Sequence, residues 1–230
     1  MENPGKIGLV YMDYPYLRSK VEPYKSHKSN MLLIILIGTI VISLWADKNL
    51  ALKEQMLFIP YRIKHQQEYH RFLTHGFIHA DFPHLAFNMM TLYFMGEYLY
   101  LEWMNLYGNA GILYFCILYF VGMIAATFFP MMKHQDQPAY RSLGASGAVS
   151  AVLFAVILWN PNLSLSLMFI PIPIPAYIFG PLYLLFEYFS LKKGNTGIAH
   201  DAHLGGAIFG ILFVLLLDPQ KGIQFVNLFH

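Results

Sequence analysis

The chain has 230 residues, of which 57% are hydrophobic and only 12% are charged. A soluble domain usually carries about twice that fraction of charged residues, so the composition excludes an ordinary soluble protein and indicates one compact polytopic membrane unit. The net charge is +2, and no basic cluster suggests binding to nucleic acid. The one cysteine, Cys116, excludes an internal disulfide, and the first 30 residues hold no apolar stretch typical of a cleavable signal peptide.

Six apolar segments are each expected to form a helix that crosses the membrane, because a hydrocarbon core of about 30 Å requires roughly 20 helical residues. The first segment is short, and the fifth opens with alternating prolines, so its regular helix should begin after Pro175. The predicted fold is all-α, a six-transmembrane-helix bundle over residues 31–218, between a polar cytoplasmic N-terminal segment (1–30) and a short C-terminal tail (219–230). The segments are Met31–Ala46, Pro83–Trp103, Gly111–Met132, Leu143–Trp159, Leu165–Leu191 and Ile198–Leu217.

The membrane topology is indicated by residues at the ends of these segments. Trp45, Trp103 and Trp159 fall where an indole ring suits the membrane interface. Four cations precede the first span and favour a cytoplasmic N-terminus. In the whole chain, however, more lysines and arginines fall on the exterior face that this topology implies than on the cytoplasmic face. We expect a multi-pass protein of the cell (plasma) membrane, with the long Asp47–Phe82 connection partly embedded and buried on protein. The four cations are Arg18, Lys20, Lys25 and Lys28.

With six spans, the second, fourth and sixth segments all begin on the same face of the membrane. Polar residues lie near each start: His84 and Asn88 in the second, Ser146 in the fourth, and His200 and His203 in the sixth. Since a helix rises about 1.5 Å per residue, these side chains should differ in depth by only several ångströms. The sequence therefore predicts one polar site, a turn or two below one surface.

Ser146 lies in the motif Gly144-Ala145-Ser146-Gly147 at the start of the fourth segment. One interpretation is a small-residue face that lets another helix approach closely. The other is a nucleophile, because a serine at a helix N-terminus lies beside free backbone N–H groups that can hold an oxyanion.

A serine nucleophile requires a base, and His203 is the candidate. Gly206 and Gly210 follow it as a Gly-xxx-Gly face, which permits tight packing on the small residues of the fourth segment. A histidine within a membrane span is a functional hypothesis by default, although a hydrogen bond between helices would also account for it.

His84 and Asn88 are four residues apart and therefore share one helix face. Both side chains can donate hydrogen bonds to a developing oxyanion. The alternative is that they cap the helix or bond to a loop.

Taken together, these motifs resemble those of the rhomboid intramembrane serine proteases. The resemblance extends from about Tyr69 to Leu217 and includes the stretches HRFLTHGFIHADFPHLAFN and PIPIPAYIFGPLYLLFEY. It implies a dyad of Ser146 and His203, with an oxyanion hole formed by His84, Asn88 and the Ser146 backbone N–H, and no metal or other cofactor. It also implies an endopeptidase of the lipid bilayer that hydrolyses a peptide bond in or near the transmembrane segment of single-span membrane proteins.

Three positions depart from the family's pattern. The first loop has His70-Arg71 where the family often has Trp-Arg, and Tyr100 stands where a glutamate is common. Ser150 replaces an aromatic residue that often stacks on the catalytic histidine. The orientation of His203 must then come from another side chain, for which His200 and Tyr183 are the candidates.

Two other functions compete with the protease. One is a membrane hydroxylase with a histidine-box metal site, suggested by His75-xxx-His79 and His200-xx-His203 among ten histidines, but that function leaves Gly144–Gly147 unexplained. The other is a non-catalytic relative that binds helices, against which the intact dyad counts.

Lateral entry of a substrate helix requires a gap between helices, and the fifth span is the expected gate. Prolines break its start, and Pro181 removes a further backbone donor. We expect three bulky side chains, Phe186, Tyr188 and Phe189, to fill the space between the second and fifth segments when the gate is shut.

Overall fold

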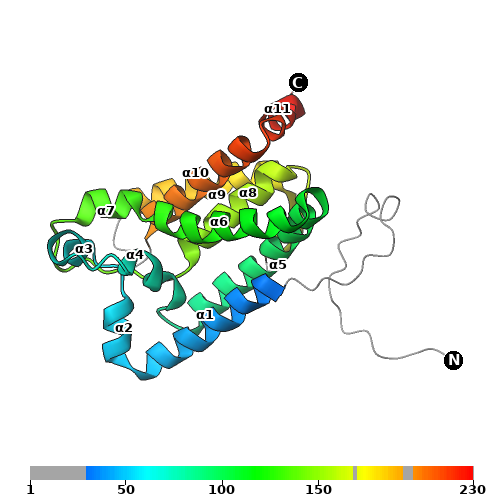
Figure 1. The fold of residues 1–230 in the computed structure, drawn as a ribbon. Coiled ribbons are helices and arrows are strands. Elements are labelled where there is room, and N and C mark those ends of the chain that lie inside the picture. Colours follow the sequence, from blue (N-terminus) through cyan, green and yellow to red (C-terminus); the bar gives the residue numbers. More distant parts are fainter. Residues whose placement is uncertain (1–29, 168–169, 194–198, 230) are drawn as a thin grey trace.

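The computed structural model describes residues 30–167, 170–193 and 199–229 (Figure 1). In this part of the chain six long helices dominate: α1 (Asn30–Lys48), α5 (Phe82–Tyr107), α6 (Asn109–Ala126), α8 (Ser146–Trp159), α9 (Ala176–Lys193) and α10 (His200–Leu217). Short helices connect or follow them: α2 (Leu50–Met56), α3 (Pro60–Gln66), α4 (Arg71–Thr74), η2 (His75–Phe77), α7 (Phe128–His134), α11 (Gln220–Val226) and η3 (Asn227–Phe229). The polar N-terminal segment predicted over residues 1–30 lies, except for Asn30, outside the described residues.

The predicted all-α membrane bundle is confirmed in its coarse form. Among the residues that the structure describes, three stretches are long and apolar enough to cross a membrane, namely α1, the combined α6–α7 stretch Asn109–His134, and α10. The apolar α8 is shorter, with 14 residues. Many large apolar side chains on the outside of the bundle are exposed, which suits a surface that faces lipid.

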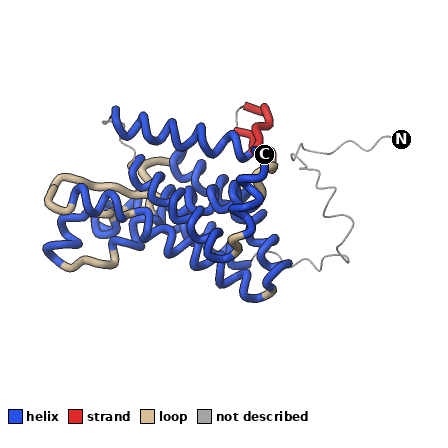
Figure 2. Tube along the Cα trace, turned by 90° about the horizontal axis from the view of Figure 1, so that it is seen from above, coloured by secondary structure: helices blue, strands red, loops and turns tan. Residues whose placement is uncertain are grey.

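The predicted fifth segment is wrong as one span from Leu165. Residues Ser164–Leu167 (β1) and Ile170–Pro175 (β2) pair as an antiparallel hairpin at the end of α9 (Figure 2). Proline has no N–H to donate to a sheet, so the alternating prolines of β2 suit a strand with an unpaired edge. The regular helix begins at Ala176, directly after Pro175, as predicted.

The predicted third segment is broken near its end, between α6 and α7. Pro130 explains the break, because a proline ring clashes with the carbonyl four residues earlier, here that of Ala126. The released Ala126 carbonyl faces α10, where a Cβ atom placed on Gly205 would lie 3.0 Å from its oxygen. The side chain of Thr127 donates to the Ile124 carbonyl at 2.7 Å and satisfies another acceptor at this helix end.

Helix α8 is the centre of the bundle and packs against α5, α6, α9 and α10 (Figure 1). Its closest partner is α10, because the two backbones touch at glycines. A Cβ atom placed on Gly206 would lie 2.0 Å from the carbonyl oxygen of Gly147, and one on Gly210 would lie 2.1 Å from that of Ala151. The Gly-xxx-Gly face of the sixth predicted segment therefore packs on the small residues of the fourth, as the sequence predicted.

Two of the three tryptophans predicted at the membrane interface are covered by protein. Trp103 and Trp159 are buried and lie edge to face, with ring centroids 5.7 Å apart. They close the core where α5 and α8 end, while Trp45 at the end of α1 is exposed.

The long first loop is folded into α2, α3, α4 and η2. Arg71, only 1% exposed, donates from its guanidinium to the carbonyls of Glu54 and Leu57 at 2.8 and 2.7 Å and so ties α4 to the region of α2. A backbone bridge between Phe58 and Ser142 then joins this loop to the segment that leads into α8.

Candidate active site

Ser146 is the first residue of α8, and the chain turns sharply before it. Gly144 has φ +115°, a left-handed conformation that L side chains rarely adopt. Because this turn interrupts the chain, the helix begins at Ser146 and not at Leu143, where the predicted segment began. The ring of His84 also lies against Gly144, since a Cβ atom there would be 2.6 Å from His84 Cε1. Glycine at position 144 thus serves both the turn and the approach of His84. The half-buried Ser146 stands among backbone N–H groups of the first turn of α8.

His203 lies on α10 across from Ser146. The contact of Gly206 with Gly147 brings the start of α10 against the start of α8, and a Cβ atom on Gly147 would lie 3.5 Å from the Ala202 carbonyl. The His203 side chain is 13% exposed, which leaves it reachable from the surface. Within the described residues the Ser146 hydroxyl and the His203 ring are not hydrogen-bonded to each other. Catalytic hydrogen bonds are often long without substrate and tighten only when it binds.

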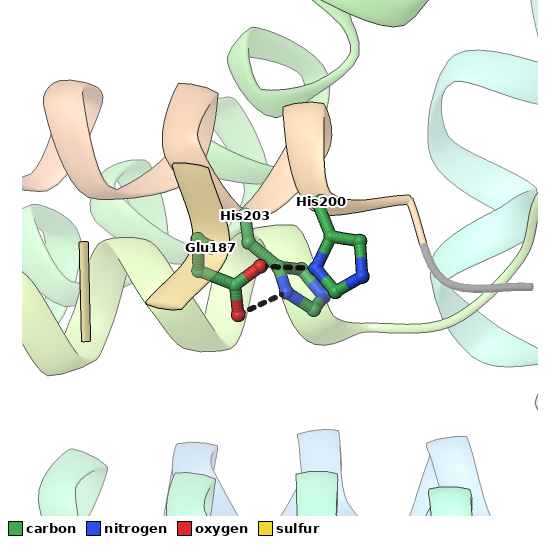
Figure 3. Close-up of side chains that lie close together, drawn as sticks. All are labelled: Glu187, His200 and His203. Carbon is green, nitrogen blue, oxygen red and sulfur yellow. Dashed lines mark hydrogen bonds and ion pairs between the residues drawn. The ribbon is translucent and has the colours of Figure 1, made fainter. Parts of the chain in front are cut away.

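The carboxylate of Glu187, a residue of α9, contacts the His203 ring (Figure 3). This carboxylate contacts Nδ1 of His203 at 2.9 Å and Nδ1 of His200 at 2.5 Å, and the Glu187 side chain is only 3% exposed. An ionised carboxylate can only accept hydrogen bonds, so both imidazoles donate from Nδ1. The Nε2 atom of His203 is then left with a free lone pair, which is the form that a general base requires.

Glu187 was missed in the sequence, where His200 and Tyr183 were the candidates for orienting His203. The Tyr183 hydroxyl instead lies 3.2 Å from Ser150 Oγ, and His200 reaches His203 through the shared carboxylate. A signal was present, because Glu187 is the only charged residue in the predicted segment Leu165–Leu191. An ionisable residue in a membrane span is costly unless it has a partner.

His84 and Asn88 lie on α5 beside the turn that precedes Ser146. The Asp81 side chain caps α5 by accepting from the His84 backbone N–H at 2.8 Å, so neither His84 nor Asn88 is the cap. Nδ1 of His84 accepts a long hydrogen bond (3.5 Å) from the Ala80 backbone, which leaves the proton on Nε2. That nitrogen lies beside Gly144. The Asn88 amide donates one hydrogen to the His84 carbonyl at 2.8 Å and retains a second.

Two further histidines support the Ser146 turn from the first loop. The His75 carbonyl accepts from the Gly144 backbone at 2.9 Å, and Nε2 of His79 accepts from the Ala145 backbone at 3.3 Å. Both rings are buried, and burial lowers the pKa of His75 to about 4 and that of His79 to about 3. His75 also bonds to the Arg71 carbonyl through Nδ1. The His79 ring therefore supports the turn directly, whereas His75 supports it through its backbone carbonyl, and each ring has one nitrogen engaged by a backbone group.

The family model of the Rhomboid domain matches residues 66–220. Among the relatives, RHOMBOID-like protein 12, mitochondrial, of Arabidopsis thaliana is 31% identical over 60% of this chain and 43% of its own length. Rhomboid protein 1, mitochondrial, of Saccharomyces cerevisiae is 25% identical over 89% of this chain and 59% of its own. Presenilin-associated rhomboid-like protein A, mitochondrial, of Danio rerio is 27% identical over 79% of this chain and 46% of its own length.

These relatives correct the predicted location. All carry names that place them in mitochondria, so the expectation of a plasma-membrane protein is wrong. Lysines and arginines next to a first span report which side of a membrane they occupy, and carry no information on which organelle holds that membrane.

The chain spans about half the length of the curated relatives it matches. The Rhomboid domain model, however, covers most of the chain and includes the turn at Ser146, the start of α5 and the whole of α9 and α10. The chain belongs to the rhomboid family.

Proposed function

We propose that the chain is an intramembrane serine endopeptidase, with Ser146 as nucleophile and His203 as general base. The observation that carries this proposal is the arrangement around His203. Its Nδ1 is held by the Glu187 carboxylate at 2.9 Å, and the packing of Gly206 on Gly147 places its helix against the start of α8. A serine, a base and a group that orients the base are the parts of a nucleophilic hydrolase.

In the first step the Ser146 oxygen attacks the substrate carbonyl while Nε2 of His203 accepts the hydroxyl proton. The Glu187 carboxylate stabilises the imidazolium that forms. The negative charge on the substrate oxygen is held by the Ser146 backbone N–H, the Nε2–H of His84 and the free hydrogen of the Asn88 amide. The imidazolium then protonates the leaving amine. Water, activated by the same ring, hydrolyses the acyl-enzyme and regenerates Ser146.

The proposed substrates are single-span membrane proteins cut in or near their transmembrane segments. A peptide bond inside an intact helix is hydrogen-bonded and shielded, so the substrate must unwind locally before Ser146 can attack it. The six long helices α1, α5, α6, α8, α9 and α10 are proposed to cross the bilayer, and the names of the relatives favour a mitochondrial membrane.

The decisive experiment measures cleavage of a model single-span substrate, and labelling by a fluorophosphonate probe, in detergent. Ser146→Ala and His203→Ala should each abolish turnover. The double variant should be no worse than either, because the pair acts as a unit. Ser150→Ala is the matched control and should retain activity, since Ser150 lies one turn further into α8 and bonds to Tyr183. Substantial turnover by Ser146→Ala, or a probe that labels another residue, would end this assignment.

A further inference from the structure

The cluster of Glu187, His200 and His203 contains more than the dyad uses. His200 is 4% exposed, faces the carboxylate at the start of α10 and has no part in the proposed steps of hydrolysis. One ligand-type atom from each of the three residues lies within 4.8 Å of the others. The two rings stand nearly at right angles, with centroids 6.0 Å apart and an interplanar angle of 82° (Figure 3).

This combination matches the donor set of a zinc site. Zn²⁺ prefers imidazole nitrogen and carboxylate oxygen in tetrahedral geometry, and open sites keep three protein ligands and one exchangeable position. With metal–ligand bonds of about 2.0–2.1 Å, tetrahedral ligand atoms are roughly 3.4 Å apart. The Glu187 carboxylate oxygens now lie 2.5 Å from Nδ1 of His200 and 2.9 Å from Nδ1 of His203. Each of these distances must increase by less than about 1 Å for a zinc ion to replace the two bridging protons.

We propose that Zn²⁺ binds to Glu187, His200 and His203 and reversibly inhibits the enzyme. The inhibition part rests on the proposed function, whereas the binding part does not. A zinc ion on Nδ1 of His203 requires that lone pair, so the neutral ring must carry its proton on Nε2. That nitrogen can then no longer accept the Ser146 proton. The ion thus converts the base into a donor.

The ligand chemistry also predicts which ions act. Mg²⁺ and Ca²⁺ prefer cages of oxygen ligands, and two of the three donors here are nitrogens. Zinc should therefore inhibit at concentrations at which magnesium and calcium have no effect.

Binding is tested first on the Ser146→Ala protein, whose zinc affinity is measurable whether or not the chain is a protease. Titration calorimetry with Zn²⁺ alone should show one ion bound per chain at this cluster. Loss of an outer-shell partner typically costs 10–100-fold in metal affinity, so removal of a ligand by His200→Gln or Glu187→Gln should weaken binding by about 100-fold or more. His65→Gln is the matched control, because His65 is an exposed histidine that faces a carboxylate, Asp136. It should leave this binding unchanged.

A second measurement covers the case in which a ligand variant does not fold. Co²⁺ bound to Ser146→Ala protein should give the visible absorption bands of a tetrahedral site, and Zn²⁺ should displace them. Bands of octahedral cobalt, or zinc binding that His200→Gln and Glu187→Gln leave unchanged, would overturn the site.

Inhibition is tested on the enzyme that retains Ser146. Zn²⁺ should lower turnover, and a chelator should restore it. With each enzyme's rate normalised to its own rate without zinc, His200→Gln should raise the inhibiting zinc concentration at least about tenfold. Zinc binding without any protease activity would reject the proposed function and keep the site. An active enzyme that binds zinc at the cluster and retains its full rate would reject the inhibition alone.

Discussion

At the scale of single residues, the contact between Glu187 and His203 replaces one that the family often obtains from an aromatic ring. Ser150 occupies that ring's position in the sequence and bonds to Tyr183, so it offers His203 no stacking surface. The carboxylate supplies orientation by a charge-assisted hydrogen bond. It fixes the tautomer of the ring as well as its direction, which stacking alone does not.

The Glu187→Gln variant tests this role. A glutamine amide accepts from one ring but donates to the other, so His200 and His203 can no longer both keep the proton on Nδ1. We expect kcat to fall by about 10²–10⁴-fold with little change in KM, as for a wrong tautomer in a serine–histidine triad. The control is Glu97→Gln, a carboxylate on α5 outside the site, which should retain the wild-type rate. An unchanged kcat in Glu187→Gln would show that the carboxylate is only structural.

The neutral histidines of the first loop predict how stability depends on pH. Both His75 and His79 have a pKa that burial lowers in the folded state, to about 4 and about 3, against about 6.5 when unfolded. The unfolded chain therefore binds more protons below pH 6.5, and acidification from pH 7 towards pH 4 must destabilise the fold. For His75 alone the loss amounts to about 3 kcal/mol when the unfolded ring is fully protonated and the folded ring is not.

This prediction is checked by thermal unfolding in detergent between pH 7.5 and pH 4.5. The midpoint should fall steadily below about pH 6.5. The double variant His75→Asn, His79→Gln keeps hydrogen-bonding atoms near the bonded nitrogens and removes both titrating rings, so its profile should be flatter. A variant profile as steep as that of the wild type would place the acid sensitivity elsewhere.

At the scale of elements, the sequence predicted helices wherever a long apolar run carried no interruption. It located α1, α5, α8 and α10 to within a few residues, because the requirement to hide backbone polar groups from lipid is strong. It missed the α6–α7 break at Pro130 and the β1–β2 hairpin, where prolines decide the local structure inside an apolar run. Composition alone does not separate a strand from a helix start.

The candidate site was predictable for a different reason. Ser146, His203, His84 and Asn88 are polar residues at helix starts, where a lipid environment makes them conspicuous. Glu187 and His79 were not found, since their roles depend on contacts between elements far apart in the chain: α9 with α10, and the first loop with the turn before α8.

The α8–α10 contact makes a prediction about a single methyl group. In Gly206→Ala the new Cβ would lie 2.0 Å from the Gly147 carbonyl oxygen, so the helices must separate. We expect a loss of about 1–3 kcal/mol in stability, as for overpacked cores, together with a lower rate of fluorophosphonate labelling because Ser146 and His203 move apart. Gly38→Ala is the matched control, since nothing lies within 4 Å of the added Cβ atom and alanine favours a helix. Equal melting temperatures for the two variants would contradict the close contact.

At the scale of the whole molecule, the packing of α9 bears on the proposed entry of a substrate. In the described part of the chain α9 packs on α10, on α8 and on the hairpin, and makes little contact with α5. Phe186 and Phe189 are each 62% exposed. Tyr188 was predicted to share their role, but it lies in a groove with residues of α7 and α10, such as Met132 and Leu204. We therefore propose that the two phenylalanines, without Tyr188, form the gate between α5 and α9.

Removal of either ring should ease entry between α5 and α9. We expect Phe186→Ala or Phe189→Ala to raise turnover of a membrane-embedded substrate, at some loss of thermal stability, and to leave the rate on a small water-soluble ester unchanged. Tyr188→Ala is the matched control: it removes an aromatic ring from the other side of α9 and should not raise turnover.

The alternative is that the first loop moves instead. Cysteines in the first turns of α5 and the last turns of α9, crosslinked in a Cys116→Ser background, distinguish the two. If the crosslinked enzyme cuts transmembrane substrates at the full rate, then α9 is not the gate, and loss of that rate with ester hydrolysis retained supports it.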